Sequence, residues 1–171
     1  IHADCPHYWK FGKENETEDA FTIRMAKNLE DLIIKEGADT IAGFVAEPVQ
    51  GAGGVIPPSK NYFDLIQPIL KKYNVPLIAD EVICGFGRTG NLWGCDTYNI
   101  KPDIISIAKG MGNGFPVGGV LIKNHIKSKF GMLGTTFGGN HLACTSVISV
   151  LDIIKNEKLV NNSKLLELYF K

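Results

Sequence analysis

Leu77-Ile-Ala-Asp80-Glu-Val82 and Pro102-Asp-Ile-Ile-Ser-Ile-Ala-Lys109 follow the same design. Each is a short run of β-branched and small apolar residues, bounded by turn residues, with an ionisable side chain at its carboxyl end. This pattern is typical of buried parallel strands. The sequence therefore predicts an α/β fold in which adjoining strands present Asp80 and Lys109 at one edge of a sheet.

Asp80 and Lys109 are the candidate catalytic pair. In open α/β sheets a ligand binds in the crevice outside the carboxyl ends of the strands, so both side chains can converge on one small molecule. An amine and a carboxylate suit a cofactor that has a carbonyl carbon and a basic ring nitrogen. Pyridoxal phosphate has both, because a lysine can bind the carbon as a Schiff base while an aspartate keeps the ring nitrogen protonated.

The local pattern leaves two other interpretations open. A strand that ends in Asp80-Glu81 also occurs in phosphate-hydrolysing enzymes, where it holds magnesium beside a Gly-x4-Gly-Lys-Ser/Thr loop. The chain shows no such loop, because Gly12-Lys13 is followed by Glu14 and lacks the earlier glycine. Alternatively, Asp80 and Lys109 are two unrelated strand-end charges.

The length, charge and hydropathy of the chain limit the classes of protein to which it can belong. The chain has 171 residues, which suits one domain, and 18 basic against 18 acidic side chains. This balance argues against nucleic acid or an anionic membrane as the main partner. No apolar run approaches a membrane span, and four cysteines without a Cys-x2-Cys pair indicate reduced thiols. We therefore expect a cytoplasmic or mitochondrial matrix location.

The first residues contain three possible zinc ligands, His2, Cys5 and His7. A fourth ligand at a recognisable spacing is missing, and structural zinc sites nearly always have four. We therefore expect an ordinary surface loop here and predict no metal site.

The first half of the chain predicts helix and strand in alternation. Thr17 caps a helix that Gly37 ends, and a strand over Ile41–Ala46 leads to Glu47. After a loop rich in glycine and proline, Ser59 is the expected cap of a second helix. The apolar faces of the two helices comprise Phe21, Met25, Leu29, Leu32 and Ile33, and Tyr62, Leu65, Ile66, Ile69 and Leu70.

The second half continues the alternation. We expect Pro68 to kink or shorten the second helix, and residues 91–99 to form a short helix or irregular structure. Val117-Gly-Gly-Val-Leu-Ile122 predicts a further strand. Apolar spacing predicts a helix from Leu142 to about Ile154 and another helical segment over residues 159–170, with a break at Asn161-Asn162.

Four motifs together carry a resemblance to a known family. They are Ala46-Glu-Pro-Val-Gln-Gly-Ala-Gly-Gly-Val55, Asp80-Glu-Val-Ile-Cys-Gly-Phe-Gly-Arg-Thr-Gly90, Ala108-Lys-Gly-Met-Gly-Asn-Gly-Phe-Pro116 and Gly134-Thr-Thr-Phe-Gly-Gly-Asn140. In this order and at these separations the chain resembles the class III pyridoxal-phosphate aminotransferases from about residue 17 to residue 154. The resemblance implies the large domain of the type I aminotransferase fold, a mixed and mostly parallel sheet flanked by helices.

The resemblance also implies roles for five residues. Lys109 matches the Schiff-base lysine, Asp80 the acid on the pyridine nitrogen, and Val82 a residue packed on one face of the cofactor ring. Glu47 matches an acidic residue of the active site. Thr136 matches a threonine that reaches the cofactor phosphate of the neighbouring subunit, which implies a homodimer.

The implied activity is transamination between an amine or ω-amino acid and a keto acid such as pyruvate or 2-oxoglutarate. The branch within the family is open. Ala52 and Ile83 replace residues usual in ornithine- and acetylornithine-type members, so residues 47–100 resemble the ω-amino acid and plant 4-aminobutyrate branch more closely. Residues 109–142 look more like the acetylornithine branch.

Members of this family run to about four hundred residues, which exceeds one-domain length. We therefore expect an incomplete large domain over residues 1–141, followed by helices over residues 142–171 that lead towards a C-terminal small domain. The alternative function is that of a truncated, catalytically inactive relative with a structural or partner-binding role, whose uncovered apolar faces reduce its solubility.

Overall fold

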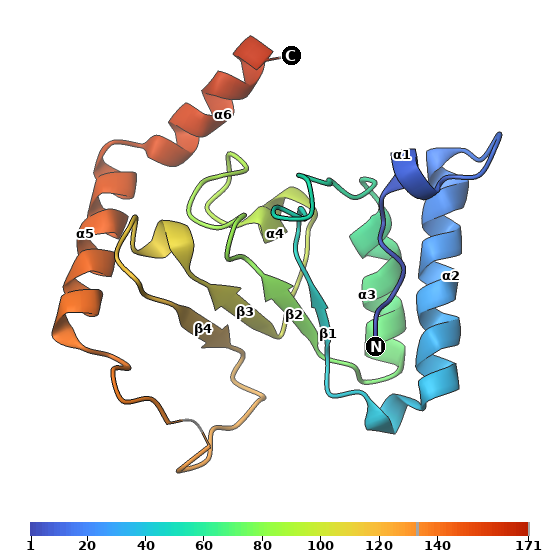
Figure 1. Ribbon diagram of the computed structural model, residues 1–171, viewed down its shortest axis with the longest axis horizontal. Coiled ribbons are helices and arrows are strands. Elements are labelled where there is room, and N and C mark those ends of the chain that lie inside the picture. Colours follow the sequence, from blue (N-terminus) through green and yellow to red (C-terminus); the bar gives the residue numbers. More distant parts are fainter. Residues whose placement is uncertain (133, 171) are drawn as a thin grey trace. The chain divides into compact units, whose positions relative to one another are not determined.

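The computed structural model describes residues 1–132 and 134–170, which form two compact units. The first unit comprises residues 1–79 and 95–103, and the second comprises residues 80–94 and residues 104 onwards. Both units contain helices and strands (Figure 1). Within the described residues, no helix combines the length and hydropathy that a bilayer crossing requires.

The first unit contains helices and a parallel pair of strands. Its elements are α1 (Tyr8–Phe11), α2 (Glu18–Glu36), a 3-10 turn (Ala38–Thr40), β1 (Phe44–Ala46), α3 (Tyr62–Lys72), β2 (Leu77–Asp80, whose last residue belongs to the second unit) and α4 (Gly94–Thr97, whose first residue also does). β1 pairs with β2 in register from Phe44 opposite Leu77 to Ala46 opposite Ala79. Figure 1 shows α2 and α3 side by side.

Local chemistry sets both ends of α2, as the sequence predicts. The hydroxyl of Thr17 accepts a hydrogen bond from the backbone N–H of Ala20 at 3.2 Å, and Glu18 and Asp19 occupy the first turn. Gly37 ends the helix with a φ of 85° and donates its N–H to the carbonyl of Ile33. The buried core of this unit comes from both long helices and the β2 region: Phe21, Met25, Leu29, Ile33, Tyr62, Phe63, Ile66, Leu70, Val75, Leu77 and Ala79.

The second unit is built around an antiparallel pair. Its elements are β3 (Ile104–Ile107), a 3-10 turn (Lys109–Met111), β4 (Gly119–Ile122), α5 (His141–Asn156) and α6 (Leu159–Phe170). β3 pairs with β4 from Ile104 opposite Ile122 to Ile107 opposite Gly119. β3 ends at Ile107, so Lys109 lies two residues beyond the strand that it was expected to end.

Two predicted local features are wrong. Ser59 does not cap α3: its hydroxyl is buried without a hydrogen-bond partner, its carbonyl accepts the N–H of Tyr62, and the helix begins after Asn61. The final helical break lies at Glu157 and Lys158, where Lys158 has a φ of 54°. α6 continues through residues 161 and 162.

The other expected helices and strands are present, with boundaries that differ from the predicted ones. The expected strands shrink to β1 and β4, and residues 91–99 contain only the short α4. α3 continues four residues beyond Pro68, so the proline does not end it. The four cysteines form no disulfide; Cys84 and Cys95 are buried, whereas Cys144 is exposed.

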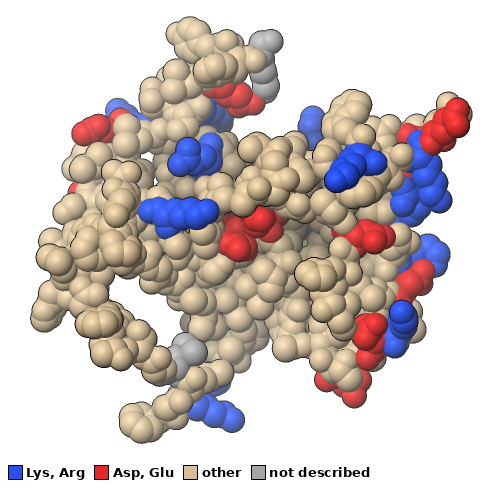
Figure 2. Space-filling view, viewed as in Figure 1, with Lys and Arg blue, Asp and Glu red and all other residues tan. Residues whose placement is uncertain are grey.

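Basic and acidic side chains are interspersed on the surface. Figure 2 shows both signs over the helices at the right of the view, without a continuous patch of one sign on this face. Near the start of α2, the Arg24 guanidinium donates to both carboxylate oxygens of Glu16 at 2.7 Å. This bidentate pair lowers the pKa of the half-buried Glu16 carboxyl to about 2.

Tyr62 makes the first unit sensitive to alkaline pH. Burial, with smaller contributions from Cys5 and Asp4, raises the pKa of its phenol from 10.0 to about 12. The unfolded chain ionises this phenol near pH ~10, so its contribution to stability is full below that pH and falls as the pH rises towards about 12. We expect Tyr62→Phe to reduce the alkaline loss of unfolding free energy in urea titrations, whereas the exposed Tyr169→Phe control retains it. Equal alkaline losses in both variants would contradict this assignment.

Candidate active site

Lys109 follows β3 in a strained backbone conformation. Ala108 is extended, and Lys109 then enters the left-handed region with a φ of 43° at the start of the 3-10 turn. Its carbonyl accepts the N–H groups of Gly112 and Asn113, each at 3.1 Å. A left-handed lysine costs about 1–2 kcal/mol, and strain of this kind clusters at functional sites. The side chain is exposed.

The turn after Lys109 requires a glycine at position 112. A Cβ atom there would lie 2.6 Å from Cγ1 of Val117 and closer still to the carbonyl oxygen of Phe115. The hydroxyl of Ser146 in α5 also donates to the carbonyl of Gly112 at 3.3 Å. Close packing therefore holds the lysine turn against its own loop and against α5.

Asp80 and Val82 form a second turn at the carboxyl end of β2. Oδ1 of Asp80 accepts the backbone N–H of Val82 at 3.0 Å, which is the geometry of an Asx turn. Both residues are half-buried. The hydrogen bond fixes the aspartate side chain relative to the backbone of Val82.

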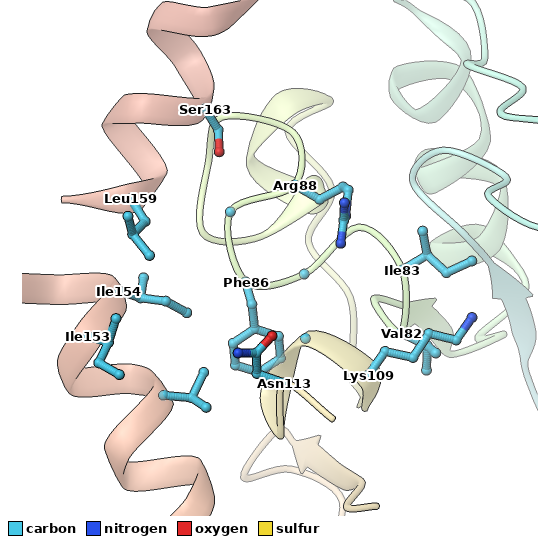
Figure 3. A pocket seen from close by; sticks show the side chains of 14 residues that line it. Val82, Ile83, Phe86, Arg88, Lys109, Asn113, Ile153, Ile154, Leu159 and Ser163 are labelled. Carbon is cyan, nitrogen blue, oxygen red and sulfur yellow. The ribbon is translucent and has the colours of Figure 1, made fainter. Parts of the chain in front are cut away.

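A cavity of about 640 Å³ brings part of the predicted site together. Its walls come from the turn after β2, the lysine turn, α5 and α6, and all of them belong to the second unit. The lining residues are Val82, Ile83, Gly85, Phe86, Gly87, Arg88, Lys109, Gly110, Asn113, Val150, Ile153, Ile154, Leu159 and Ser163. Figure 3 shows Lys109 and Val82 on one side of the cavity and Ile153, Ile154 and Leu159 on the other. Its volume suits a small-molecule ligand.

The five predicted site residues are distributed unequally. Lys109 and Val82 line the cavity, and Asp80 stands two residues before Val82 without lining it. Glu47 lies in the first unit just after β1, where its carboxylate accepts the N–H of Gly51 at 2.8 Å. Thr136 is exposed in the segment between β4 and α5, outside the cavity lining.

The cavity lining includes Phe86, Arg88 and Asn113, which were not among the predicted site residues. Phe86 and Asn113 have φ values of 62° and 44°, and the ring of Phe86 meets the indole of Trp93 edge to face at 5.3 Å between centroids. The available signal was the position of each residue within a run of glycines. Such runs mark backbone that takes unusual conformations close to a site.

The magnesium alternative fails on the geometry of Glu81. Its side chain is fully buried, and Oε2 accepts the N–H of Gly94 at 2.9 Å. A buried carboxylate in this position does not join Asp80 as an open metal ligand at the strand end. Within the residues described, no group of three or more histidine, cysteine, aspartate or glutamate side chains has a metal-binding arrangement.

Residues 5–171 match the family model for class III aminotransferases. This match covers nearly the whole chain, so the chain belongs to the class III aminotransferases. It is 49% identical over 170 residues to gamma aminobutyrate transaminase 3, chloroplastic, of Solanum lycopersicum, covering 94% of this chain and 33% of that protein. It is also 49% identical over 172 residues to a probable gamma-aminobutyrate transaminase 3, mitochondrial, of Oryza sativa subsp. indica, covering 95% and 34%.

Solved structures agree with the family. The PMP-bound form of an aminotransferase from Vibrio fluvialis superposes with a TM-score of 0.92 at 48% identity, over 97% of this chain and 39% of that one. An omega-aminotransferase from Paracoccus denitrificans gives 0.89 at 49% identity, over 97% and 39%. The predicted fold class is thus confirmed, with mixed strand pairing. The chain spans about a third of the length of its curated relatives.

The packing around Gly112 yields a test of the lysine turn. We expect Gly112→Ala to lower the free energy of unfolding by about 1–3 kcal/mol, because the new methyl group overlaps Phe115 and Val117. Gly134→Ala is the matched control, since its Cβ would meet nothing within 4 Å. Urea unfolding measures both variants. An equal, small effect of the two substitutions would show that the turn relaxes freely around position 112.

Proposed function

We propose that this chain supplies the cofactor-binding lysine and part of the active site of a pyridoxal-phosphate-dependent aminotransferase. The observation that carries the proposal is the strained Lys109, presented with Val82 on a small-molecule cavity. Family membership supports the same assignment. The proposed reaction is transamination between an amine or ω-amino acid and a keto acid.

The residues present fit the cofactor chemically. The amine of the exposed Lys109 suits its aldehyde carbon, and the small apolar Val82 suits the face of a flat ring. Asp80, held by its hydrogen bond to the N–H of Val82, supplies a carboxylate for the ring nitrogen. When bound, pyridoxal phosphate acts as an electron sink for carbanion charge.

In the proposed mechanism, Lys109 does two jobs. Its Nζ would hold the cofactor covalently and, as a free amine, would remove and return a proton at the reacting substrate carbon. Asp80 keeps a positive charge on the ring nitrogen through its carboxylate. Val82 limits the position of the ring, and the apolar side chains of α5 and α6 exclude water from the opposite wall.

An ω-amine or 4-aminobutyrate-like donor is the substrate class we propose. The relatives named above are gamma-aminobutyrate transaminases and an omega-aminotransferase, at 49% identity. The residues at 52 and 83 favour the same branch. For the compartment we propose the mitochondrial matrix, supported by the name of the rice relative.

The Lys109 assignment is tested in the complete product of the reading frame that encodes this chain, so that any flanking segments are present. After incubation with pyridoxal phosphate and reduction with borohydride, we expect peptide mass spectrometry to place the pyridoxyl group on Lys109. Lys109→Met should abolish the label and reduce turnover by at least about 10³-fold, whereas the exposed Lys123→Met control retains both. Equal labelling of many lysines, or turnover in Lys109→Met, would remove Lys109 from this role.

A homodimer is part of the proposal. Large apolar side chains are exposed on α5, α6 and the segment between β4 and α5: Phe130, Met132, Phe137, Leu142, Ile148, Leu151, Ile153, Leu165, Leu166, Leu168, Tyr169 and Phe170. Exposed apolar surface of this extent marks an interaction site. The exposed Thr136 lies in the same segment, where its hydroxyl is available to a neighbouring subunit.

We expect the complete reading-frame product to sediment as a dimer, because association covers these apolar side chains. Analytical ultracentrifugation at micromolar concentration measures this state. Sedimentation as a monomer with full transaminase activity would contradict the dimer. A well-folded product that binds no cofactor would favour the second candidate, a truncated relative with a partner-binding role, which the same exposed surface supports.

A further inference from the structure

Glu81 is a carboxylate beside the candidate site that the proposed mechanism does not use. It stands between Asp80 and Val82, yet its side chain is fully buried, while the two neighbours are half-buried. Burying a carboxylate is costly unless it makes compensating hydrogen bonds. A residue of this kind at this position therefore calls for a physical role.

Hydrogen bonds connect Glu81 to β3, to the turn that follows it and to the start of α4. Its backbone N–H donates to the carbonyl of Ser106 in β3 at 2.9 Å, and its own carbonyl accepts the N–H of Gly85 at 2.9 Å. Its carboxylate Oε2 accepts the N–H of Gly94 at 2.9 Å. The backbone bonds fix the turn that begins at Glu81, and the side chain ties that turn to the start of α4.

The side-chain bond closes a loop of cavity-lining residues. The chain between Glu81 and Gly94 contains Val82, Ile83, Phe86 and Arg88, which all line the cavity. Gly85 packs directly on Glu81, because a Cβ there would lie 2.7 Å from the glutamate carbonyl oxygen. Glu81 therefore joins the two ends of this loop from its buried side, while the opposite side faces the cavity.

We propose that Glu81 is a positioning residue, which rests on the proposed function. By holding Gly94, its carboxylate fixes the loop over residues 82–93 and so keeps Asp80 and Val82 in the Asx turn that presents them to the cofactor. The bond from the Val82 N–H to Oδ1 of Asp80, at 3.0 Å, is the link through which Glu81 acts. Glu81 itself does not touch the cofactor.

Three variants of Glu81 distinguish the effect of its side-chain length from the effect of its negative charge. Glu81→Gln keeps the length of the side chain and an acceptor oxygen for the Gly94 N–H, but removes the charge. Glu81→Asp keeps the charge but is one methylene shorter, and Glu81→Ala loses both. If Glu81 acts by holding Gly94, Gln should resemble the wild type, whereas Asp and Ala should both fail.

The first readout needs no cofactor. Amide hydrogen exchange of the cofactor-free protein should accelerate at Val82 and Gly94 by roughly tenfold or more in Glu81→Ala and Glu81→Asp, because a buried N–H loses its acceptor. Exchange in β4 should be unchanged. Asp152→Ala, which removes an exposed acid in the same unit, is the matched control and should match the wild type at Val82.

The second readout uses the complete reading-frame product well below its unfolding temperature. Glu81→Ala should weaken pyridoxal phosphate binding by roughly tenfold or more and shift the pH midpoint of the absorbance of the lysine-bound cofactor, while Glu81→Gln restores both. A purely structural glutamate would lower the unfolding temperature and leave that pH midpoint unchanged.

The outcomes distinguish this inference from the proposed function. Unchanged exchange at Val82 in Glu81→Ala, with normal cofactor binding, overturns the role of Glu81 and leaves the proposed function intact. Restoration by Asp instead of Gln also overturns it, because charge would then matter more than reach. Accelerated exchange at Val82 in a protein whose wild type captures no cofactor on Lys109 overturns the proposed function, while Glu81 still positions Val82.

Discussion

The hydrogen bond from the N–H of Glu81 to the carbonyl of Ser106 is the constraint on which the candidate site depends. It fixes the chain just beyond β2 beside β3, three residues before Lys109. Glu81 and Ser106, which lie twenty-five residues apart in the sequence, are therefore neighbours within the second unit. The Asx turn at Asp80 and the left-handed turn at Lys109 are local additions to this single backbone link.

Much of the fold was predictable because local chemistry and tertiary packing agree. Thr17, Gly37 and the apolar spacing of α2 each specify the same helix, and β2 ends at Asp80 as the apolar run indicates. Alternating strand and helix signals were sufficient for the α/β class. The four motifs between residues 46 and 140, taken together, were sufficient for the family, which the match over residues 5–171 confirms.

The errors arise where tertiary contacts override local preference. Asn161 and Asn162 are poor helix formers, but α6 continues through them because it packs against the glycine-rich turn. A Cβ at Gly87 would lie 3.3 Å from Val160, and one at Gly90 would lie 3.3 Å from the backbone of Lys164. The antiparallel pairing of β3 with β4 could not be predicted from the apolar run of β3 either, since such a run carries no information about the direction of its partner strand. The burial of Glu81 has the same origin, because its carboxylate accepts a hydrogen bond from the N–H of Gly94, thirteen residues away along the chain.

The distribution of cysteines gives each compact unit its own chemical label. Cys95 belongs to the first unit and Cys84 to the second, and they are only 4% and 2% exposed, whereas Cys144 is open to solvent. A thiol-modifying reagent will therefore react with the exposed Cys144 and the half-buried Cys5 before the two buried thiols, which it can reach only when their surroundings open. The rates of the two slow modifications then report separately on the opening of each unit, without any engineered probe.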